Sequence, residues 1–173
     1  MRKCLRLTGL LRVEVVEGGK KHVKELFLLT EEFFPYIQPS EELILDRMNS
    51  GSVSYFVALF EGKVVGFVDV EFNDSSVFDE LHKPVVVEKG VQAKILGLAV
   101  KKDFQKKGIG SLLLKKALSF SKEKQASSVV MLVKESNKIA QKLYERFGFS
   151  KKGVLQRELD GERVLLFSKS FSN

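Results

Sequence analysis

The sequence predicts a single α/β domain with a mixed, mostly antiparallel central sheet of about six or seven strands, flanked by about four helices. Three observations support this fold class. The chain has 173 residues, of which 44% are hydrophobic, which suits one domain with a substantial core. The spacing of hydrophobic residues alternates along the chain between the periods of strands and helices. No repeat, low-complexity tract or Pro/Gly-rich linker interrupts it, so we assign residues 1–173 to one domain and residues 1–10 to a short N-terminal extension.

The first half of the chain predicts three strands and two helices. Leu11–Val16 is rich in β-branched residues and predicts the first strand. His22–Phe34 carries hydrophobic residues at helical spacing and is followed by a proline, whereas Ser40–Asn49 begins with an N-cap serine and two acidic residues. Ser54–Glu61 and Lys63–Phe72 flank a glycine, which is typical of a hairpin.

The second half alternates strands with helices. Residues 73–91 are polar and irregular, and we expect a long excursion or a loosely paired strand there. Ala93–Val100 is hydrophobic almost throughout, as a strand covered on both faces would be. Ile109–Lys124 has one hydrophobic stripe and predicts a helix. The remaining elements are a strand at Ser128–Val133, a helix from Ser136 or Asn137 that ends before Gly148, and strands at Phe149–Gln156 and Val164–Ser170.

Charge is distributed unevenly along the chain, whose net charge is +7. Residues 30–82 contain 2 basic and 11 acidic residues, whereas residues 93–173 contain 18 basic and 7 acidic residues. This asymmetry favours an acidic surface that suits a cation and a basic surface that suits a polyanion. Two ordinary solvated surfaces are the alternative interpretation.

Several classes of protein are disfavoured. The single cysteine, Cys4, allows no intrachain disulfide. Neither a signal peptide nor a membrane span of ~18 hydrophobic residues is present, so we predict a soluble cytoplasmic protein without a membrane partner. His22 and His82 are too far apart in sequence to suggest a metal site. No aromatic RNA-binding motif or helix-turn-helix pattern is present, and we therefore expect no nucleic-acid partner.

The segment Gln105-Lys106-Lys107-Gly108-Ile109-Gly110 connects a buried strand to a helix. The N-terminus of a helix presents unpaired N–H groups and a partial positive charge, and glycines let a phosphate approach the backbone. Lysines on both sides of the turn add positive charge. A bound pyrophosphate is therefore expected. Tight packing at the turn is the alternative, because neither the P-loop spacing nor the dinucleotide fingerprint is present.

This segment resembles the GCN5-related N-acetyltransferase (GNAT) superfamily. In that family a Leu-Ala-Val-like triplet, here Leu98-Ala99-Val100, precedes the pattern [Q/R]-x-x-G-x-[G/A] at the start of a long helix. A second family signature follows in the expected order, as Glu135-Ser136-Asn137 and then Leu143-Tyr144-Glu145-Arg146-Phe147-Gly148-Phe149. The resemblance is close over residues 92–150 and looser elsewhere. It implies a GNAT-like fold and an N-acetyltransferase that uses acetyl-CoA and no metal.

The resemblance also implies roles for individual residues. Backbone groups at the end of the central strand would pair with the pantetheine arm, and the loop amides would hold the pyrophosphate. An asparagine at position 137 would contact the pantetheine, and Tyr144 would act as general acid toward the departing thiolate. The implied cofactor-binding residues are Leu98, Ala99, Val100, Gln105, Lys106, Lys107, Gly108, Ile109, Gly110, Ser111 and Asn137. Periodicity alone favours a plain core aromatic residue at Tyr144, and the family resemblance reverses that preference.

The general base is where the sequence departs from the family pattern. Subfamilies that place a glutamate before the Leu-Ala-Val triplet would have it at Lys94, and others would place a base at Leu132. Asp69 and Glu71 share one face of the preceding strand with Phe67. We select Glu71 as the residue that orients or deprotonates the amine. Solvent exposure of both acids is the alternative.

The acidic region from residue 30 to residue 82 predicts a cationic acceptor, which would be a protein lysine or N-terminus, a polyamine or an aminoglycoside-like amine. Aromatic residues near the end of the first helix could form apolar walls. The acceptor could thus be a small molecule or a protein, and a homodimer is left open. A non-catalytic CoA-binding or regulatory domain is the alternative function. The acids used in this prediction include Glu31, Glu32, Glu41, Glu42, Asp46, Asp79 and Glu80.

Overall fold

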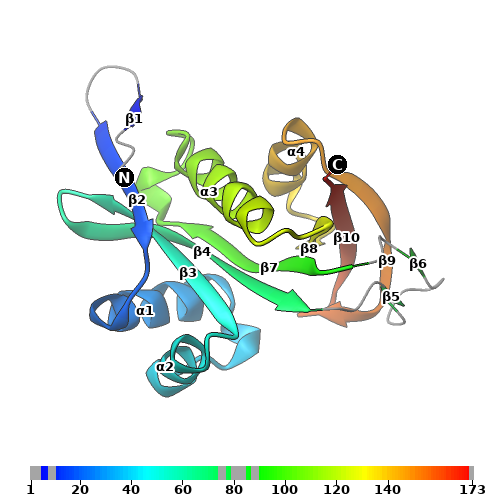
Figure 1. Cartoon of the computed structure of the whole chain (residues 1–173), viewed down its shortest axis with the longest axis horizontal. Helices are drawn as coiled ribbons and strands as arrows, with labels where there is room; N and C mark the ends of the chain where they lie inside the picture. Colours follow the sequence, from blue (N-terminus) through cyan, green and yellow to red (C-terminus); the bar gives the residue numbers. More distant parts are fainter. Residues whose placement is uncertain (1–4, 8–10, 74–76, 79–84, 87–89, 172–173) are drawn as a thin grey trace. The chain divides into compact units, whose positions relative to one another are not determined.

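The computed structural model describes residues 5–7, 11–73, 77–78, 85–86 and 90–171. The chain forms two compact units, the first built from Met1–Glu71 and Gly97–Ser119 and the second from Phe72–Leu96 and Phe120–Asn173. Strand β7 (Gln92–Val100) contributes to both units. Figure 1 shows the helices and strands coloured along the chain. Cys4, Asp79, Glu80 and His82 lie outside the described residues.

The strands of the first unit follow the order β1-β2-β3-β4-β7. Neighbouring strands from β1 to β4 are antiparallel, and Tyr55 of β3 lies opposite Asp69 of β4. The glycine hairpin between β3 and β4 is confirmed, with Glu61 and Gly62 both at positive φ. The strand bounds are β1 Leu5–Leu7, β2 Leu11–Glu17, β3 Val53–Phe60 and β4 Lys63–Asn73.

The helices of the first unit begin and end where their sequence signals place them. The side chain of Ser40 accepts the N–H of Leu43 at 3.0 Å and caps α2, as predicted. Pro35 follows α1 and begins a short 3-10 turn. Residues 102–104, where we expected no regular element, form another 3-10 turn. The bounds are η1 Lys20–His22, α1 Val23–Phe33, η2 Pro35–Ile37, α2 Glu41–Ser50, η3 Lys102–Phe104 and α3 Ile109–Glu123.

Alternate residues of β4 point to opposite faces of the first unit. A Cβ atom built on Gly66 would lie 2.7 Å from the Ala99 carbonyl oxygen and 3.3 Å from Leu113 of α3, so this face packs beneath α3 (Figure 1). Phe67 lies on the other face, where its ring contacts that of Phe34 at the end of α1. Asp69 shares this second face and therefore lies on the side of α1 and α2.

The second unit contains the start of β7 and strands β8, β10 and β9, in that order. The parallel ladder between β7 and β8 runs from Gln92↔Ser128 to Ile95↔Met131, and β10 pairs antiparallel with both β8 and β9. Two short strands, β5 and β6, lie where we expected an excursion or a loosely paired strand. The bounds are β5 Val77–Phe78, β6 Val85–Val86, β8 Ser128–Lys134, α4 Lys138–Arg146, β9 Ser150–Leu159 and β10 Glu162–Ser170.

These elements confirm the predicted α/β class with a mixed, mostly antiparallel sheet and four α-helices. Most predicted elements are present to within two residues of their predicted ends. Strand β1 lies inside the segment that we assigned to an N-terminal extension, and the sequence pattern did not predict it. The assignment of residues 1–173 to a single domain stays a prediction.

Candidate active site

The loop after β7 is closed by hydrogen bonds to the end of that strand. The side-chain amide of Gln105 donates to the carbonyl oxygen of Val100 at 2.9 Å. The N–H of Lys101 donates to the carbonyl oxygen of Val65 in β4, also at 2.9 Å. Gln105 therefore shapes the turn through its side chain.

The start of α3 presents backbone N–H groups. Lys106 and Gly108 have positive φ values of 57° and 82°, and the N–H of Leu112 forms the first bond of the helix, to the carbonyl oxygen of Gly108 at 3.1 Å. The amides from Gly108 to Ser111 thus precede the first intrahelical bond. An anion such as a pyrophosphate fits this set of donors and the positive end of the helix dipole.

The loop lysines differ in their contacts. The ammonium group of Lys107 donates to the carbonyl oxygen of Asp103 at 2.8 Å and lies 5.4 Å from the centre of the Phe104 ring. Lys102 forms an ion pair with Glu32 of α1 at 3.7 Å. Both ammonium groups add positive charge to the loop. Each of them also contacts a group of the protein, so their charge is not wholly available to a ligand.

Asp69 is the buried acid of the first unit, with only 6% of its surface exposed. Glu71, two residues along the same face, is half-buried. The alternative that both acids are exposed is therefore wrong for Asp69. One carboxylate oxygen of Asp69, Oδ1, has no hydrogen-bond partner among the described residues.

Burial raises the pKa of Asp69 to about 7, and the charge of Glu71 adds to the rise. The backbone amide of Gly97 and the guanidinium of Arg47 oppose it. Burial, followed by the charge of Asp69, raises the pKa of Tyr55 to about 12, although a hydrogen bond with Arg47 acts against this shift. At neutral pH Tyr55 keeps its proton, whereas Asp69 can gain or lose one.

The second unit carries the other two predicted site residues, Asn137 and Tyr144. Asn137 caps α4, because its side-chain oxygen accepts the N–H of Ala140 at 3.0 Å. Tyr144 is buried on the inner side of α4, where its ring contacts those of Phe149 and Phe167. Burial raises the pKa of Tyr144 to about 12, so its phenol is a proton donor at neutral pH.

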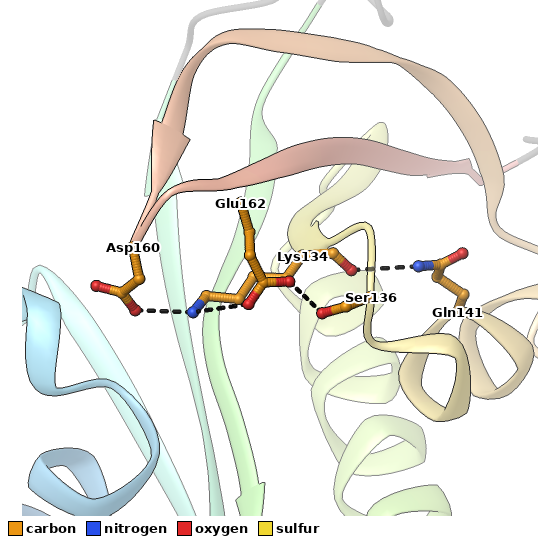
Figure 2. A network of polar contacts seen from close by, with 5 residues as sticks. All are labelled: Lys134, Ser136, Gln141, Asp160 and Glu162. Carbon is orange, nitrogen blue, oxygen red and sulfur yellow. Dashed lines mark hydrogen bonds and ion pairs between the residues drawn. The ribbon is translucent and has the colours of Figure 1, made fainter.

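A polar network holds the segment in front of α4 (Figure 2). Lys134 at the end of β8 binds Asp160 at 2.7 Å and Glu162 at 3.5 Å, and both acids belong to the β9–β10 hairpin. Ser136 also donates to Glu162, and the side chain of Gln141 donates to the Lys134 carbonyl oxygen at 3.2 Å. The network fixes residues 134–136 and with them the position of the Asn137 cap.

The described part of the chain shows neither a candidate metal cluster nor a candidate membrane-spanning helix. No group of three or more His, Cys, Asp or Glu side chains there is arranged to hold a metal ion. Among the helices that the structure describes, none has the length and hydropathy needed to cross a membrane.

Comparison with known proteins decides the family. The model of the acetyltransferase (GNAT) family matches residues 23–149, which include the loop and both signatures. The chain belongs to the GNAT family. It is an acetyl-CoA-dependent acetyltransferase, as the resemblance implied.

The relatives of this GNAT enzyme include archaeal proteins. It is 29% identical to an N-alpha-acetyltransferase of Sulfurisphaera tokodaii over 145 residues, which cover 82% of this chain and 80% of the relative. It is 30% identical to an N-alpha-acetyltransferase of Sulfolobus acidocaldarius over 141 residues, which cover 79% of this chain and 77% of the relative.

Solved structures share the GNAT fold. Arabidopsis thaliana NAA60, solved in complex with a bisubstrate analogue, aligns with a TM-score of 0.77 over 92% of this chain and 99% of its own, at 19% identity. Ard1 from Thermoplasma volcanium aligns with a TM-score of 0.74 over 93% and 99% of the two chains, at 23% identity.

Sequence reasoning selected Glu71 of this GNAT enzyme and passed over its neighbour Asp69. The usable signal was an acid inside the otherwise hydrophobic run from Val64 to Val70, since such an acid is costly to bury without a purpose. No sequence pattern predicted that Arg47 and Tyr55 would lie near Asp69. They belong to α2 and β3 and come close to Asp69 only in the folded chain.

Proposed function

We propose that this GNAT enzyme acetylates α-amino groups at the N-termini of proteins or peptides, with a preference for cationic acceptors. The observation that carries this proposal is the similarity to N-alpha-acetyltransferases over about four fifths of both chains. It narrows the list of acceptors that the sequence predicted, in which lysine side chains and polyamines were also candidates.

Acidic side chains on α1 and α2 support the preference for cations. The exposed acids of these helices are Glu31, Glu32, Glu41, Glu42 and Asp46. Near them, Tyr36 is 38% exposed, and its ring packs edge-on against that of Phe34. An amine with neighbouring positive charges would be attracted to the acids, while the aromatic rings would contact its apolar parts.

The cofactor half of the site is assigned to the loop and the strand before it. Backbone groups of Leu98, Ala99 and Val100 would pair with the pantetheine arm, and the amides from Lys106 to Ser111, including Ile109, would hold the pyrophosphate. Acetyl-CoA supplies the activated acetyl group as a thioester. Asn137 is proposed to contact the pantetheine through its amide group, whose oxygen also caps α4.

Tyr144 is proposed as the general acid, and Glu71 as a carboxylate that orients the incoming ammonium group. Tyr144→Phe keeps the ring contacts with Phe149 and Phe167 but removes the acidic hydroxyl. We expect kcat to fall by roughly 10²-fold, with little change in CoA affinity. An unchanged kcat would remove Tyr144 from the mechanism.

An acceptor panel tests the proposed function. Peptides with a free N-terminus and basic, neutral or acidic second and third residues are compared with an N-blocked lysine peptide and a polyamine, and released CoA thiol is measured. Basic peptides with a free N-terminus should give the highest kcat/KM. Faster turnover of neutral or acidic peptides than of every cationic acceptor would refute the preference, and turnover confined to the blocked lysine peptide would refute the α-amine assignment.

The cytoplasmic location and the homodimer stay predictions from the sequence.

A further inference from the structure

The unpaired oxygen of Asp69 is the starting point. Asp69 is 6% exposed, and its Oδ1 atom accepts no hydrogen bond from any described residue. A buried carboxylate oxygen without a donor is costly, and folded proteins rarely retain one without a function. Among the described residues, Asp69 therefore has one carboxylate oxygen whose capacity to accept a proton or a hydrogen bond is unused.

A glycine in β7 makes room for this carboxyl group. A Cβ atom at position 97 would lie 3.0 Å from Asp69 Oδ1 and 3.2 Å from the ring of Phe34. Any larger residue would push against both groups. Gly97 lies one residue before Leu98, the first of the three residues proposed to pair with the pantetheine arm. The free oxygen is thus held beside the strand that would carry the acyl donor.

Aromatic rings connect this position to the surface. The ring of Phe34 lies 6.3 Å from that of exposed Tyr36 on one side and 6.3 Å from that of buried Phe67 on the other. Phe67 precedes Asp69 by two residues on the same face of β4. The three rings thus form a continuous row from exposed Tyr36 to the face of β4 that carries Asp69.

The charged and titratable groups that act on Asp69 come from three elements. Arg47 of α2 favours the ionised carboxylate, and Glu71 of β4 disfavours it. Tyr55 of β3 lies opposite Asp69, but its phenol stays protonated at neutral pH, because its pKa is about 12. Asp69 is thus the group of this cluster best suited to change its protonation state during turnover.

We propose that Asp69 is the general base of the enzyme, and that its unpaired Oδ1 takes a proton from the ammonium group of the acceptor. The inference rests on the proposed function, since it needs an amine acceptor. It assigns proton acceptance to Asp69 and leaves Glu71 with the orienting role.

The proton transfer converts the acceptor from R–NH3⁺ to R–NH2 and the carboxylate to a carboxylic acid. The nitrogen lone pair then forms the new N–C bond while the thioester C–S bond breaks, and the sulfur keeps the electron pair of that bond. Tyr144 donates its phenolic proton to the departing thiolate, which gives free CoA thiol, and the second proton lost by the nitrogen replaces the proton on Tyr144. Asp69 returns its own proton to solvent before the next turnover.

The acidity of Asp69 matches α-amines better than lysine side chains. An α-ammonium group has a pKa of about 8, only about one unit above that of Asp69, whereas a lysine ammonium has a pKa of about 10.4. The pKa of the donor therefore exceeds that of Asp69 by roughly three for a lysine side chain but by roughly one for an α-amine, so proton transfer from lysine is less favourable. This difference favours N-terminal amines at neutral pH.

The experiment measures kcat/KM from pH 6 to pH 9.5, with one α-amine peptide that the wild-type enzyme acetylates. Asp69→Asn keeps the shape of the side chain and removes the base. We expect a loss of roughly 10²-fold at pH 7 that shrinks toward pH 9.5, where the amine is already neutral. CoA affinity should not change. Glu17→Gln removes an exposed acid from β2 of the same unit and serves as the matched control, with a wild-type profile.

A second variant tests the position of the carboxyl group without removing it. Gly97→Ala should lower the rate in the wild-type background and have little further effect in Asp69→Asn, which has no base to displace. A wild-type rate for Asp69→Asn, an equal deficit at every pH, or a loss of CoA binding would overturn the assignment of the base alone. Failure of the wild-type enzyme on every α-amine peptide would overturn the proposed function and the inference together.

Discussion

Removing the carboxyl group of Asp69 should change how the stability of the protein depends on pH. The pKa of this group rises from 3.8 to about 7 on folding, mainly because the side chain is buried. Between these values the folded protein binds more protons than the unfolded chain, and its stability therefore falls as pH rises through this window. A rise of roughly three units at about 1.4 kcal/mol each corresponds to about 4 kcal/mol lost between pH 4 and pH 8.

Asp69→Asn has the same shape and no titration, so the loss assigned to Asp69 should disappear. The free energy of unfolding, measured by urea denaturation from pH 4.5 to pH 8.5, should favour the variant increasingly as pH rises. Groups that the substitution leaves undisturbed titrate equally in both proteins. Their effect therefore cancels when the free energy of unfolding of the wild type is subtracted from that of the variant. A difference that stays constant within about 1 kcal/mol across the range would show that Asp69 titrates normally, and the burial argument would then be wrong.

Three further substitutions test the site and its framework. Gly110→Asp should abolish CoA binding in calorimetric titration, because it places a carboxylate beside the phosphates. The uncharged Gly110→Asn should retain measurable affinity for CoA. Equal affinities of the two variants would refute the phosphate assignment. Gln105→Ala removes the bond to Val100 and should weaken CoA binding roughly 2- to 10-fold, the equivalent of one hydrogen bond; a change in stability with unchanged affinity would contradict this. Gly66→Ala should lower the free energy of unfolding by roughly 1–3 kcal/mol, because its Cβ would lie 2.7 Å from the Ala99 carbonyl oxygen; Gly19→Ala, where a Cβ meets nothing within 4 Å, is the control.

The helices and strands of this protein were predictable because their signals are local. Ser40 caps α2, as predicted, and Asn137, one of the two predicted candidates, caps α4. One strand that the sequence did not predict, β1, has three residues and gains its strand conformation by pairing with β2. So short a segment carries no periodicity of its own.

The acidic cluster was not predictable for a different reason. The environment of Asp69 comes from four separate elements, which contribute Arg47, Tyr55, Glu71 and Gly97. Alternation along β4 correctly places Asp69 and Glu71 on one face, but it does not say which acid is covered. The fold decides that question, because Asp69 Oδ1 and the ring of Phe34 both lie within 3.2 Å of a Cβ atom built on Gly97.

The loop before α3 is preorganised for its ligand. The side chain of Gln105 bonds to the end of β7, and that of Lys107 bonds to the carbonyl oxygen of Asp103. Binding then requires little loss of loop entropy, so even a fragment that carries only the charge of the cofactor should be recognised. Inorganic pyrophosphate should accordingly compete with CoA in calorimetric titration.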